Sequence, residues 1–454
     1  MKLKDICSKI GSGATPRGGK EAYKESGVPI IRSQNVLDWS FNTDGLAYID
    51  DNQASALANV EVKPGDVLLN ITGDSVARAC IVPNAITPAR VNQHVLILRA
   101  NYETNPVFLL TWLQSNKSLL LALASSGATR NALTKTMLEE LDINLPPVDV
   151  QFRIAKIVSS IQAKIEANTR LNGYLEELIA LKYSQLIMDS ECKYVPLADV
   201  IFFQEGPGIR NWQYVYGGNG VNFINIRCIQ EHALDLSNAN QISAEEAYGK
   251  YRHFLVDAGD ILMSSSGTLG RYAIARLEDL PLCMNTSVIR FRPKTDPEAY
   301  AFVYGYLTSC EFYDHLTSMA NGSAQVNFGP THLKQIEIPW PEENDLHAFN
   351  VAVMPVICLM NALRSESDRL AALRDTLLPK LMSGEIDVSE VDLTQLNSHL
   401  AELWLREEWS QELTMVVKSP SRPFMQSSAS PGTIRPVLRG CWCSWRRTTR
   451  RLPE

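Results

Sequence analysis

Two sets of loop residues in this 454-residue chain carry side chains that can hydrogen-bond to nucleic-acid bases and phosphates. Gln and Asn can make paired hydrogen bonds with adenine, Arg can do so with guanine, and Ser and Thr suit phosphate oxygens. The candidate contacts are Arg32, Gln34, Asn35, Thr72, Arg130 and Asn131 in the first set, and Asn225, Arg227, Ser266, Thr268, Arg271, Gln325 and Asn327 in the second. Such residues also suit turns at strand ends. Their recurrence at corresponding places favours a shared binding role.

Familiar catalytic signatures are missing from both halves of the sequence. The segment 11–20 (GSGATPRGGK) resembles a phosphate-binding loop, but Ala14 stands where the first glycine is required and Glu21 follows Lys20. Neither G-x-S-x-G nor H-E-x-x-H occurs, and the seven histidines form no evident triad. The nine cysteines include no C-x-x-C pair, so we expect reduced, mostly buried thiols and no structural zinc. This pattern favours a binding protein over an enzyme.

The elements that position these loops are duplicated. Gly65-Asp66-Val67-Leu68 returns as Gly259-Asp260-Ile261-Leu262, an offset of 194 residues. Leu3-Lys4-Asp5-Ile6 returns as Leu197-Ala198-Asp199-Val200 at the same offset. Solenoid repeats are much shorter, at roughly 20 to 50 residues, so this offset indicates a duplicated domain. In each copy a mixed domain precedes a long helix.

Short β-prone runs bounded by turn residues predict strands in the first copy at 28–32, 66–71 and 94–99. An apolar face at helical spacing predicts one helix over 106–123. In the second copy, the run 223–227 corresponds to the strand that begins near residue 30.

Residues 151–187 contain no proline and carry apolar residues at three- and four-residue steps, which predicts a helix roughly 55 Å long. Asn168 and Asn172 interrupt the apolar stripe, either as register-setting core residues or as surface asparagines. A second heptad-like stripe runs through 349–381. Pro355 should break a helix outside its first turn, so we expect this helix to begin near Met354 or to bend there.

These patterns predict an α+β fold. Two β-rich domains are each followed by a long helix, and the helices pack as an antiparallel coiled coil with pseudo-twofold symmetry. The expected parts are a first β-rich domain (1–147), a central helix (148–190), a second β-rich domain (191–341), a distal helix (342–386) and a partly disordered C-terminal extension (387–454). The basic, aromatic end of the extension has no counterpart in the repeat. We interpret it as an added extension or a translated frameshift.

Composition is that of an ordinary globular protein, with 45% hydrophobic and 20% charged residues. No apolar run is long enough for a membrane helix and the N-terminus lacks a signal-peptide core, so we expect a cytoplasmic protein without a membrane partner. The net charge of −7 does not by itself favour nucleic-acid binding, which would require locally basic loops.

The chain resembles the specificity subunits of type I restriction-modification systems. The resemblance is carried by Pro146–Ile157 (PPVDVQFRIAKI) at the start of the central helix and by Leu377–Ile386 (LLPKLMSGEI) at the end of the distal helix. It is also carried by Gly259–Leu262 with Ser266–Arg271 (SGTLGR) in the second domain. The first copy departs from this last segment at residues 71–78, and the similarity ends near residue 393.

The resemblance implies two target recognition domains that read the halves of a bipartite double-stranded DNA site. The paired helices would measure the spacer and dock two modification subunits that methylate adenine N6. It implies no cofactor in this chain: S-adenosylmethionine, ATP and Mg would be bound by the modification subunits and the restriction, or translocase, subunits. A helix of roughly 55 Å matches about 16 base pairs of B-DNA.

Three other interpretations remain open at this stage. The chain could specify the target of a related modification system with a different effector. It could instead be a non-enzymatic, two-headed scaffold that binds protein or glycan, in which case DNA binding that weakens steeply with salt would be absent. A hydrolase with an unrecognised site is the third.

Overall fold

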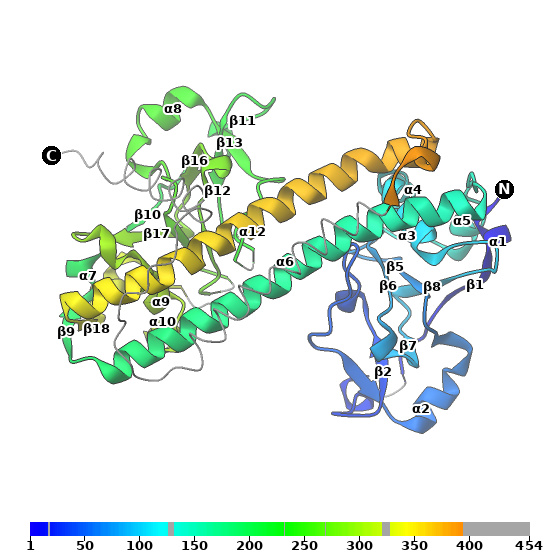
Figure 1. Cartoon of the computed structure of the whole chain (residues 1–454), viewed down its shortest axis with the longest axis horizontal. Coiled ribbons are helices and arrows are strands. Elements are labelled where there is room, and N and C mark those ends of the chain that lie inside the picture. Colours follow the sequence, from blue (N-terminus) through cyan, green and yellow to red (C-terminus); the bar gives the residue numbers. More distant parts are fainter. Residues whose placement is uncertain (17–18, 126–130, 231, 268, 320–326, 394–454) are drawn as a thin grey trace. The chain divides into compact units, whose positions relative to one another are not determined.

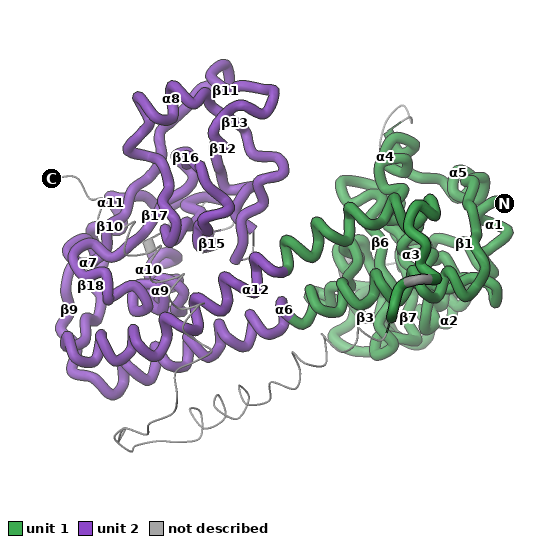
Figure 2. The backbone as a smooth tube through the Cα atoms, turned by 45° about the horizontal axis from the view of Figure 1, so that its top comes forward, with its two compact units in different colours: residues 1–167, 367–422 green, residues 168–366, 423–454 purple. Residues whose placement is uncertain are grey.

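The computed structural model describes residues 1–16, 19–125, 131–230, 232–267, 269–319 and 327–393. These residues form two compact units, green and purple in Figure 2. Unit 1 contains Met1–Ala167 and a later segment that begins at Ser367, and unit 2 contains Asn168–Glu366. Two long helices, α6 (Val148–Asp189, 42 residues) and α12 (Glu343–Ser383, 41 residues), each contribute one segment to each unit. The fold is α+β, as expected.

Unit 1 contains two four-stranded sheets (Figure 1). The first has the antiparallel order β1-β8-β5-β6, and the second has the order β3-β2-β7-β4, in which β2 and β7 are parallel. The strands are β1 (Cys7–Ser12), β2 (Val28–Ile31), β3 (Ala47–Ile49), β4 (Glu61–Val62), β5 (Val67–Asn70), β6 (Ala79–Ile81), β7 (Ala89–Val91) and β8 (Val95–Ala100). The helices before α6 are α1 (Leu3–Ile6), α2 (Asp51–Ala56), α3 (Pro106–Ser115), α4 (Lys117–Ser125) and α5 (Lys135–Glu139).

Unit 2 repeats this plan. Its sheet β10-β17-β14-β15 corresponds to β1-β8-β5-β6, and its sheet β11-β13-β12-β16 again contains one parallel pair, β12 with β16. The strands are β9 (Cys192–Pro196), β10 (Ile201–Glu205), β11 (Tyr214–Val215), β12 (Val221–Ile224), β13 (Asn240–Ile242), β14 (Ile261–Ser264), β15 (Tyr272–Ile274), β16 (Leu282–Met284), β17 (Val288–Pro293) and β18 (Glu337–Pro341), which pairs with β9. The shorter helices are α7 (Leu197–Val200), α8 (Ala244–Tyr248), α9 (Tyr300–Leu307), α10 (Cys310–Met319) and α11 (Pro330–Leu333). The predicted duplication is confirmed.

The repeated Gly-Asp-apolar segment becomes a strand buried on both faces. In β5, Val67 and Leu69 pack in one core while Leu68 packs in the other, because successive side chains of a strand point to opposite faces. In β14, Ile261 and Leu262 divide in the same way between two cores. This double burial explains why both segments are continuously apolar instead of alternating.

Two local predictions were wrong. The single helix expected over 106–123 is divided into α3 and α4, whose axes differ by 62°. Asn116 ends α3, and its side-chain amide donates to the carbonyl of Trp112 at 2.9 Å. The strand expected over 223–227 ends at Ile224, because Asn225 accepts a hydrogen bond from the backbone N–H of Arg227 and forms a turn.

The expectation that the distal helix begins near Met354 was also wrong. The helix α12 begins at Glu343 and runs through this proline. Pro355 leaves the carbonyl of Val351 without its intrahelical donor, but Val351 is 60% exposed, so water can hydrogen-bond to that carbonyl. On the opposite side of the helix, Val353 and Ile357 are fully buried in the core of unit 2. By length and composition α12 could cross a membrane, but Met360 lies in the core of unit 2 as well, and Leu378 and Leu381 lie in the core of unit 1.

Within each unit, a segment of α6 contacts a segment of α12. In unit 1, Arg374 Nη1 donates to Gln162 Oε1 at 2.8 Å, and in unit 2, Arg364 Nη2 lies 2.6 Å from Glu176 Oε1. Asn168 is 2% exposed and donates to Glu366 Oε2 at 2.8 Å, while Asn172 is 8% exposed. Both asparagines are therefore core residues, and the surface alternative was wrong.

The start of the C-terminal extension belongs to unit 1. Val388 is buried in that core, and Arg153 of α6 donates to the carbonyls of Val388 and Val391, each at 3.2 Å. The boundary expected at residue 386 therefore cuts through a packed segment. Residues 394–454, with the basic aromatic end, lie outside the described residues.

One glycine in each unit permits a close backbone approach. A Cβ on Gly13 would lie 1.7 Å from the carbonyl oxygen of Val91, and one on Gly206 would lie 2.2 Å from that of Met284. We expect Gly13→Ala and Gly206→Ala each to lower the free energy of unfolding by about 3 kcal/mol, measured by urea denaturation. Gly173→Ala is the control, since its Cβ meets nothing within 4 Å and α6 should gain about 0.5–1 kcal/mol. Wild-type midpoints for the first two variants would contradict the close approach.

Candidate nucleic-acid interface

A group of polar residues gathers at one end of the sheets of unit 1. We define polar edge 1 as Ser33, Gln34, Thr72, Arg78, His94 and Asn131. The turn after β5 holds three chain segments together through backbone hydrogen bonds. The N–H of Ile71 donates to the carbonyl of His94 (3.0 Å), and the carbonyl of Ile71 accepts from the N–H of Leu133 (2.8 Å). The N–H of Gly73 donates to the carbonyl of Asn131 (3.2 Å). The side chain of Asn70 attaches the fourth segment by donating to the carbonyl of Ser33 at 2.9 Å.

Polar edge 1 surrounds an open pocket of about 420 Å³. Its lining residues are Ser33, Gln34, Thr72, Gly73, Asp74, Ser75, Arg78 and His94. One wall is organised by a hydrogen bond of 2.6 Å between Thr72 Oγ1 and His94 Nδ1. The amide of Gln93 lies 3.3 Å from the other ring nitrogen of His94. Donors and acceptors of several kinds therefore face one opening, as a base-reading surface requires.

Unit 2 builds the same arrangement from equivalent hydrogen bonds. We define polar edge 2 as Asn225, Arg227, Ser266, Arg271, Ser287 and Asn327. In the turn after β14, the carbonyl of Ser265 accepts from the N–H of Phe328 (3.0 Å), and the N–H of Ser265 donates to the carbonyl of Ser287 (3.0 Å). These bonds correspond to Leu133 with Ile71 and Ile71 with His94 in unit 1. The N–H of Ile226 completes the edge by donating to Ser287 Oγ at 3.3 Å.

An arginine occupies the same position in both edges. The carbonyl of Arg78 accepts from the N–H of Asn70 at 2.8 Å, and the carbonyl of Arg271 accepts from the N–H of Ser264 at 2.8 Å. Arg78 lines the pocket of unit 1, and Arg271 is exposed. Each edge therefore offers a guanidinium, which can make paired hydrogen bonds to guanine or a charged contact to phosphate.

Two of the candidate contact residues make hydrogen bonds within their own domain. Asn35 is fully buried, and its amide donates to the carbonyl of Asn42 at 3.0 Å, so this side chain holds a loop and cannot reach a base edge here. The equivalent residue of unit 2, Cys228, is also buried. The guanidinium of Arg32 donates to the carbonyl of Gly45 at 2.6 Å and is likewise engaged within its own domain.

The remaining candidates divide into two groups. Gln34, Thr72, Asn131, Asn225, Arg227, Ser266, Arg271 and Asn327 lie on the polar edges defined above. Arg130, Thr268 and Gln325 lie outside the described residues. The sequence interpretation missed His94 and Arg78. Arg78 could have been found because it precedes Arg271 by 193 residues, close to the offset of the repeat.

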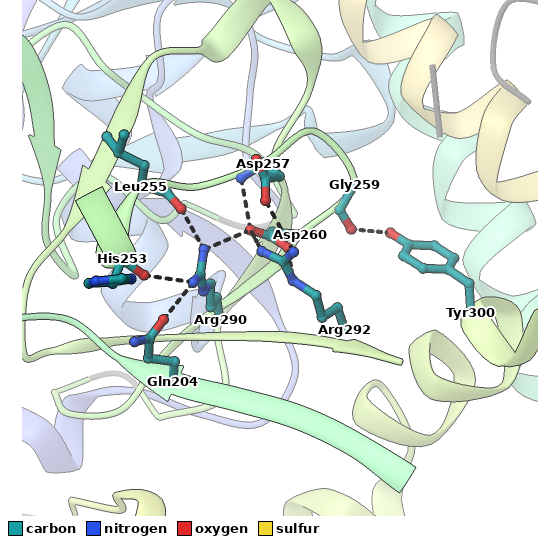
Figure 3. Close-up of polar contacts among 9 residues, drawn as sticks. All are labelled: Gln204, His253, Leu255, Asp257, Gly259, Asp260, Arg290, Arg292 and Tyr300. Atoms are coloured by element: carbon teal, nitrogen blue, oxygen red, sulfur yellow. Dashed lines mark hydrogen bonds and ion pairs between the residues drawn. The ribbon is translucent and has the colours of Figure 1, made fainter. Parts of the chain in front are cut away.

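At the opposite end of β5 and of β14 from the polar edges, a buried aspartate binds the neighbouring strand. In unit 1, Asp66 Oδ1 lies 2.7 Å from Arg99 Nε, and the hydrogen bond to Asp66 raises the pKa of Arg99. In unit 2, Asp260 is bound by two arginines of β17: Arg292 Nε at 2.8 Å and Arg290 Nη1 at 3.5 Å (Figure 3). Burial raises the pKa of the Asp260 carboxyl, and both arginines oppose that shift.

The same cluster connects β17 to β10 and to the segment that contains His253. Arg290 Nη2 donates to Gln204 Oε1 at 2.5 Å and to the carbonyl of His253 at 2.8 Å (Figure 3). Tyr300 Oη donates to the carbonyl of Gly259 at 2.8 Å, which attaches α9 to the turn before β14. Among the described residues, no group of three or more His, Cys, Asp or Glu side chains is placed to hold a metal ion.

Two α+β units with equivalent polar edges define a duplicated binding protein. A family model described as "Type I restriction modification DNA specificity domain" matches residues 1–177 and again residues 190–348. The chain therefore belongs to the family of type I restriction-modification DNA specificity proteins.

Curated relatives agree with this family. The chain is 22% identical over 411 residues to the putative type I restriction enzyme MjaX specificity subunit of Methanocaldococcus jannaschii, covering 85% of this chain and 93% of that protein. It is 22% identical over 442 residues to the type I restriction enzyme HindI specificity subunit of Haemophilus influenzae, covering 79% and 94%. A crystal structure of a type I restriction-modification S subunit from M. genitalium matches with a TM-score of 0.48 and 16% identity, covering 84% and 95%.

Proposed function

We propose that this chain is the DNA-specificity subunit of a type I restriction-modification complex and that each unit reads one half of a bipartite double-stranded DNA site. The observation that carries the proposal is the duplicated polar edge. Equivalent backbone hydrogen bonds assemble it in both units, while its side chains differ. His94 of one edge is replaced by Ser287 in the other, and Gln34 by Arg227. Equal scaffolds with unequal donors and acceptors suit two half-sites of different sequence.

The two long helices have a proposed role of their own. In the contacts between the helices, residue numbers rise along α6 as they fall along α12: Asn168 contacts Glu366 and Glu176 contacts Arg364. This order supports an antiparallel coiled coil with pseudo-twofold symmetry, which would set the distance between the half-sites. We propose that these helices also dock two modification subunits, through which the restriction subunits join the complex. The chain supplies specificity and the partners supply catalysis, with S-adenosylmethionine, ATP and Mg bound by those partners. The complex would act on DNA in the cytoplasm.

Electrostatics place a condition on this proposal. A net charge of −7 repels DNA at long range, so affinity must come from local cations such as Arg78, Arg227 and Arg271 together with the partners' surfaces. Non-specific attraction by the whole chain should therefore be weak. Most of the discrimination is then left to direct contacts at the two edges.

The alternative of a protein- or glycan-binding scaffold makes a different prediction about salt. We expect the complex of this chain with its modification subunit to bind its DNA site with an affinity that falls by several powers of ten between 50 and 200 mM salt, if about six to ten phosphates are contacted. Fluorescence anisotropy with the chain present and omitted would measure its contribution. Binding that is unaffected by omitting the chain, or that does not respond to salt, would contradict the proposal.

A further inference from the structure

A short loop in each unit connects the polar edge to the long helices. Tip loop 1 is closed by the bridge between Val36 and Phe41, and the N–H of Leu37 donates to the carbonyl of Ser40 at 3.1 Å. Tip loop 2 is closed by the bridge between Ile229 and Leu234. There the N–H of Gln230 donates to the carbonyl of Ala233 at 2.9 Å. All corresponding residues are 193 positions apart, so the loop was duplicated with its domain.

The same position of both loops has a left-handed backbone. Trp39 has a φ of 67° and His232 has a φ of 62°, and these are two of the three non-glycine residues with positive φ in the described chain. Such a conformation costs a non-glycine residue of order 1–3 kcal/mol, so surrounding contacts must hold it. Residues of this kind concentrate at sites where a side chain must be aimed.

In unit 1 the aimed side chain contacts α12. The guanidinium of Arg374 lies 4.7 Å from the centre of the Trp39 ring, within cation–π range. Arg374 is itself oriented by Gln162 of α6 at 2.8 Å. The backbone N–H of Trp39 donates to the carbonyl of Ala79 in β6 at 2.9 Å. We define clamp 1 as Trp39 with Arg374.

In unit 2 a different chemistry serves the equivalent position. His232 Nε2 lies 3.4 Å from Glu176 Oε2 of α6, and Glu176 Oε1 lies 2.6 Å from Arg364 Nη2 of α12. The His232 ring meets the edge of the Tyr272 ring, with centres 4.6 Å apart. We define clamp 2 as His232 with Glu176 and Arg364. Both clamps therefore join the tip of the loop to the helices.

Each tip loop directly follows residues of its polar edge in the sequence. Ser33 and Gln34 of polar edge 1 lie just before Val36, and the buried amide of Asn35 holds the base of the loop by donating to the carbonyl of Asn42. In unit 2, Arg227 lies two residues before Ile229. A shift of the tip on the helices would therefore also move the residues proposed to contact bases.

We propose that clamps 1 and 2 are positioning contacts that fix the orientation of each recognition domain on the helices, and thereby restrict the spacer length of the DNA site. This inference rests on the proposed function. The helix pair can measure a spacer only if each domain is held at one angle to it. A rotation of a domain on the helices would displace its polar edge along the DNA and so change the spacer length that fits.

Unit 2 has an additional polar attachment. Arg276 Nη1 contacts Ser365 Oγ of α12 at 3.4 Å, and Ser365 also hydrogen-bonds to Glu278. The equivalent loop of unit 1, Asn84–Ile86, makes no hydrogen bond or ion pair with α12 among the described residues. Loss of clamp 1 should therefore loosen its domain more than loss of clamp 2.

The test is a methylation assay on sites whose spacer is lengthened or shortened by one base pair. The chain is co-expressed with its modification subunit, and methylation is compared between the altered and the natural spacer. We expect Trp39→Leu to raise relative methylation of the altered spacers by about fivefold, since about 1 kcal/mol of a cation–π contact is lost, with base preferences in both half-sites unchanged. Trp39→Tyr, which keeps an aromatic ring for Arg374, should restore most of the discrimination. Tyr102→Leu, at a side chain that is 93% exposed, is the control.

Arg374→Lys provides a second variant that keeps the charge but loses the planar guanidinium, and it should loosen spacer choice in the same direction. Unchanged spacer discrimination in folded Trp39→Leu and Arg374→Lys complexes would overturn the inference, as would an equal loss of methylation at every spacer. A wild-type complex that methylates no split site at all would instead refute the proposed function. The two failures are therefore distinguishable.

Discussion

Replacing Asp260 with alanine is expected to lower the free energy of unfolding of unit 2 by about 3–5 kcal/mol. The Asp260 side chain is 3% exposed, and it is the carboxylate that faces Arg290 and Arg292 from inside the core. Without it, the buried guanidinium of Arg290 and the partly buried guanidinium of Arg292 lose the carboxylate that they share. The turn before β14 also loses its acceptor, since Asp260 Oδ2 accepts from the N–H of Asp257 at 2.9 Å. Recognition by polar edge 2 should be lost with the strand that carries it.

The matched control for this change is Asp257→Ala. Asp257 contacts the same Arg292 at 3.1 Å, but its side chain is 48% exposed, so its pair is worth less than about 1 kcal/mol. Urea unfolding of both variants measures the difference. Equal destabilisation by Asp257→Ala and Asp260→Ala would show that burial of the ion pair is not what stabilises unit 2. Asp66→Ala should reproduce the large effect in unit 1, through Arg99.

The duplication and the long helices could be predicted because their signals are regular. A constant offset survives divergence of the intervening loops, and a stripe with helical spacing extends over dozens of residues. The break at Asn116 and the continuity through Pro355 could not be predicted in this way. Each depends on tertiary surroundings: the first on a local side-chain cap, the second on which side of α12 faces water.

The exposure of the candidate contact residues could not be predicted for a related reason. Residue type suggests what a side chain can bind but not whether it is exposed. Asn35 is buried and its side chain hydrogen-bonds within a loop. His94 reaches polar edge 1 only because β8 lies beside β5, a pairing that the spacing of residues does not reveal. The offset of the repeat would have pointed to Arg78, had it been applied to single residues.

The second large effect concerns the equivalent arginines of the two edges. We expect Arg78→Ala and Arg271→Ala each to relax base preference in one half of the DNA site by about 10- to 100-fold, or about 1–3 kcal/mol, and to leave the other half unchanged. The two variants should affect opposite halves, because the arginines belong to different units. Competition binding against single-base variants of the site measures both halves in one experiment.

Lys63→Ala serves as the control for charge. It removes one exposed cation from unit 1 without touching polar edge 1, so any loss of affinity should be small and equal for all sequences. If Arg78→Ala and Arg271→Ala weakened both halves equally, the arginines would be phosphate contacts or general stabilisers. The assignment of one half-site to each unit would then lose its support.

The central claim is that this chain alone decides which split DNA sequence is modified. The most direct measurement is methylation mapping: the chain is expressed with its modification subunit in a methylation-free host, and the genome is sequenced with a base-modification readout. The account predicts N6-methyladenine in a motif of two defined halves separated by an unspecified spacer, absent when this chain is omitted. Methylation that persists without the chain, or a continuous motif without a spacer, would contradict it.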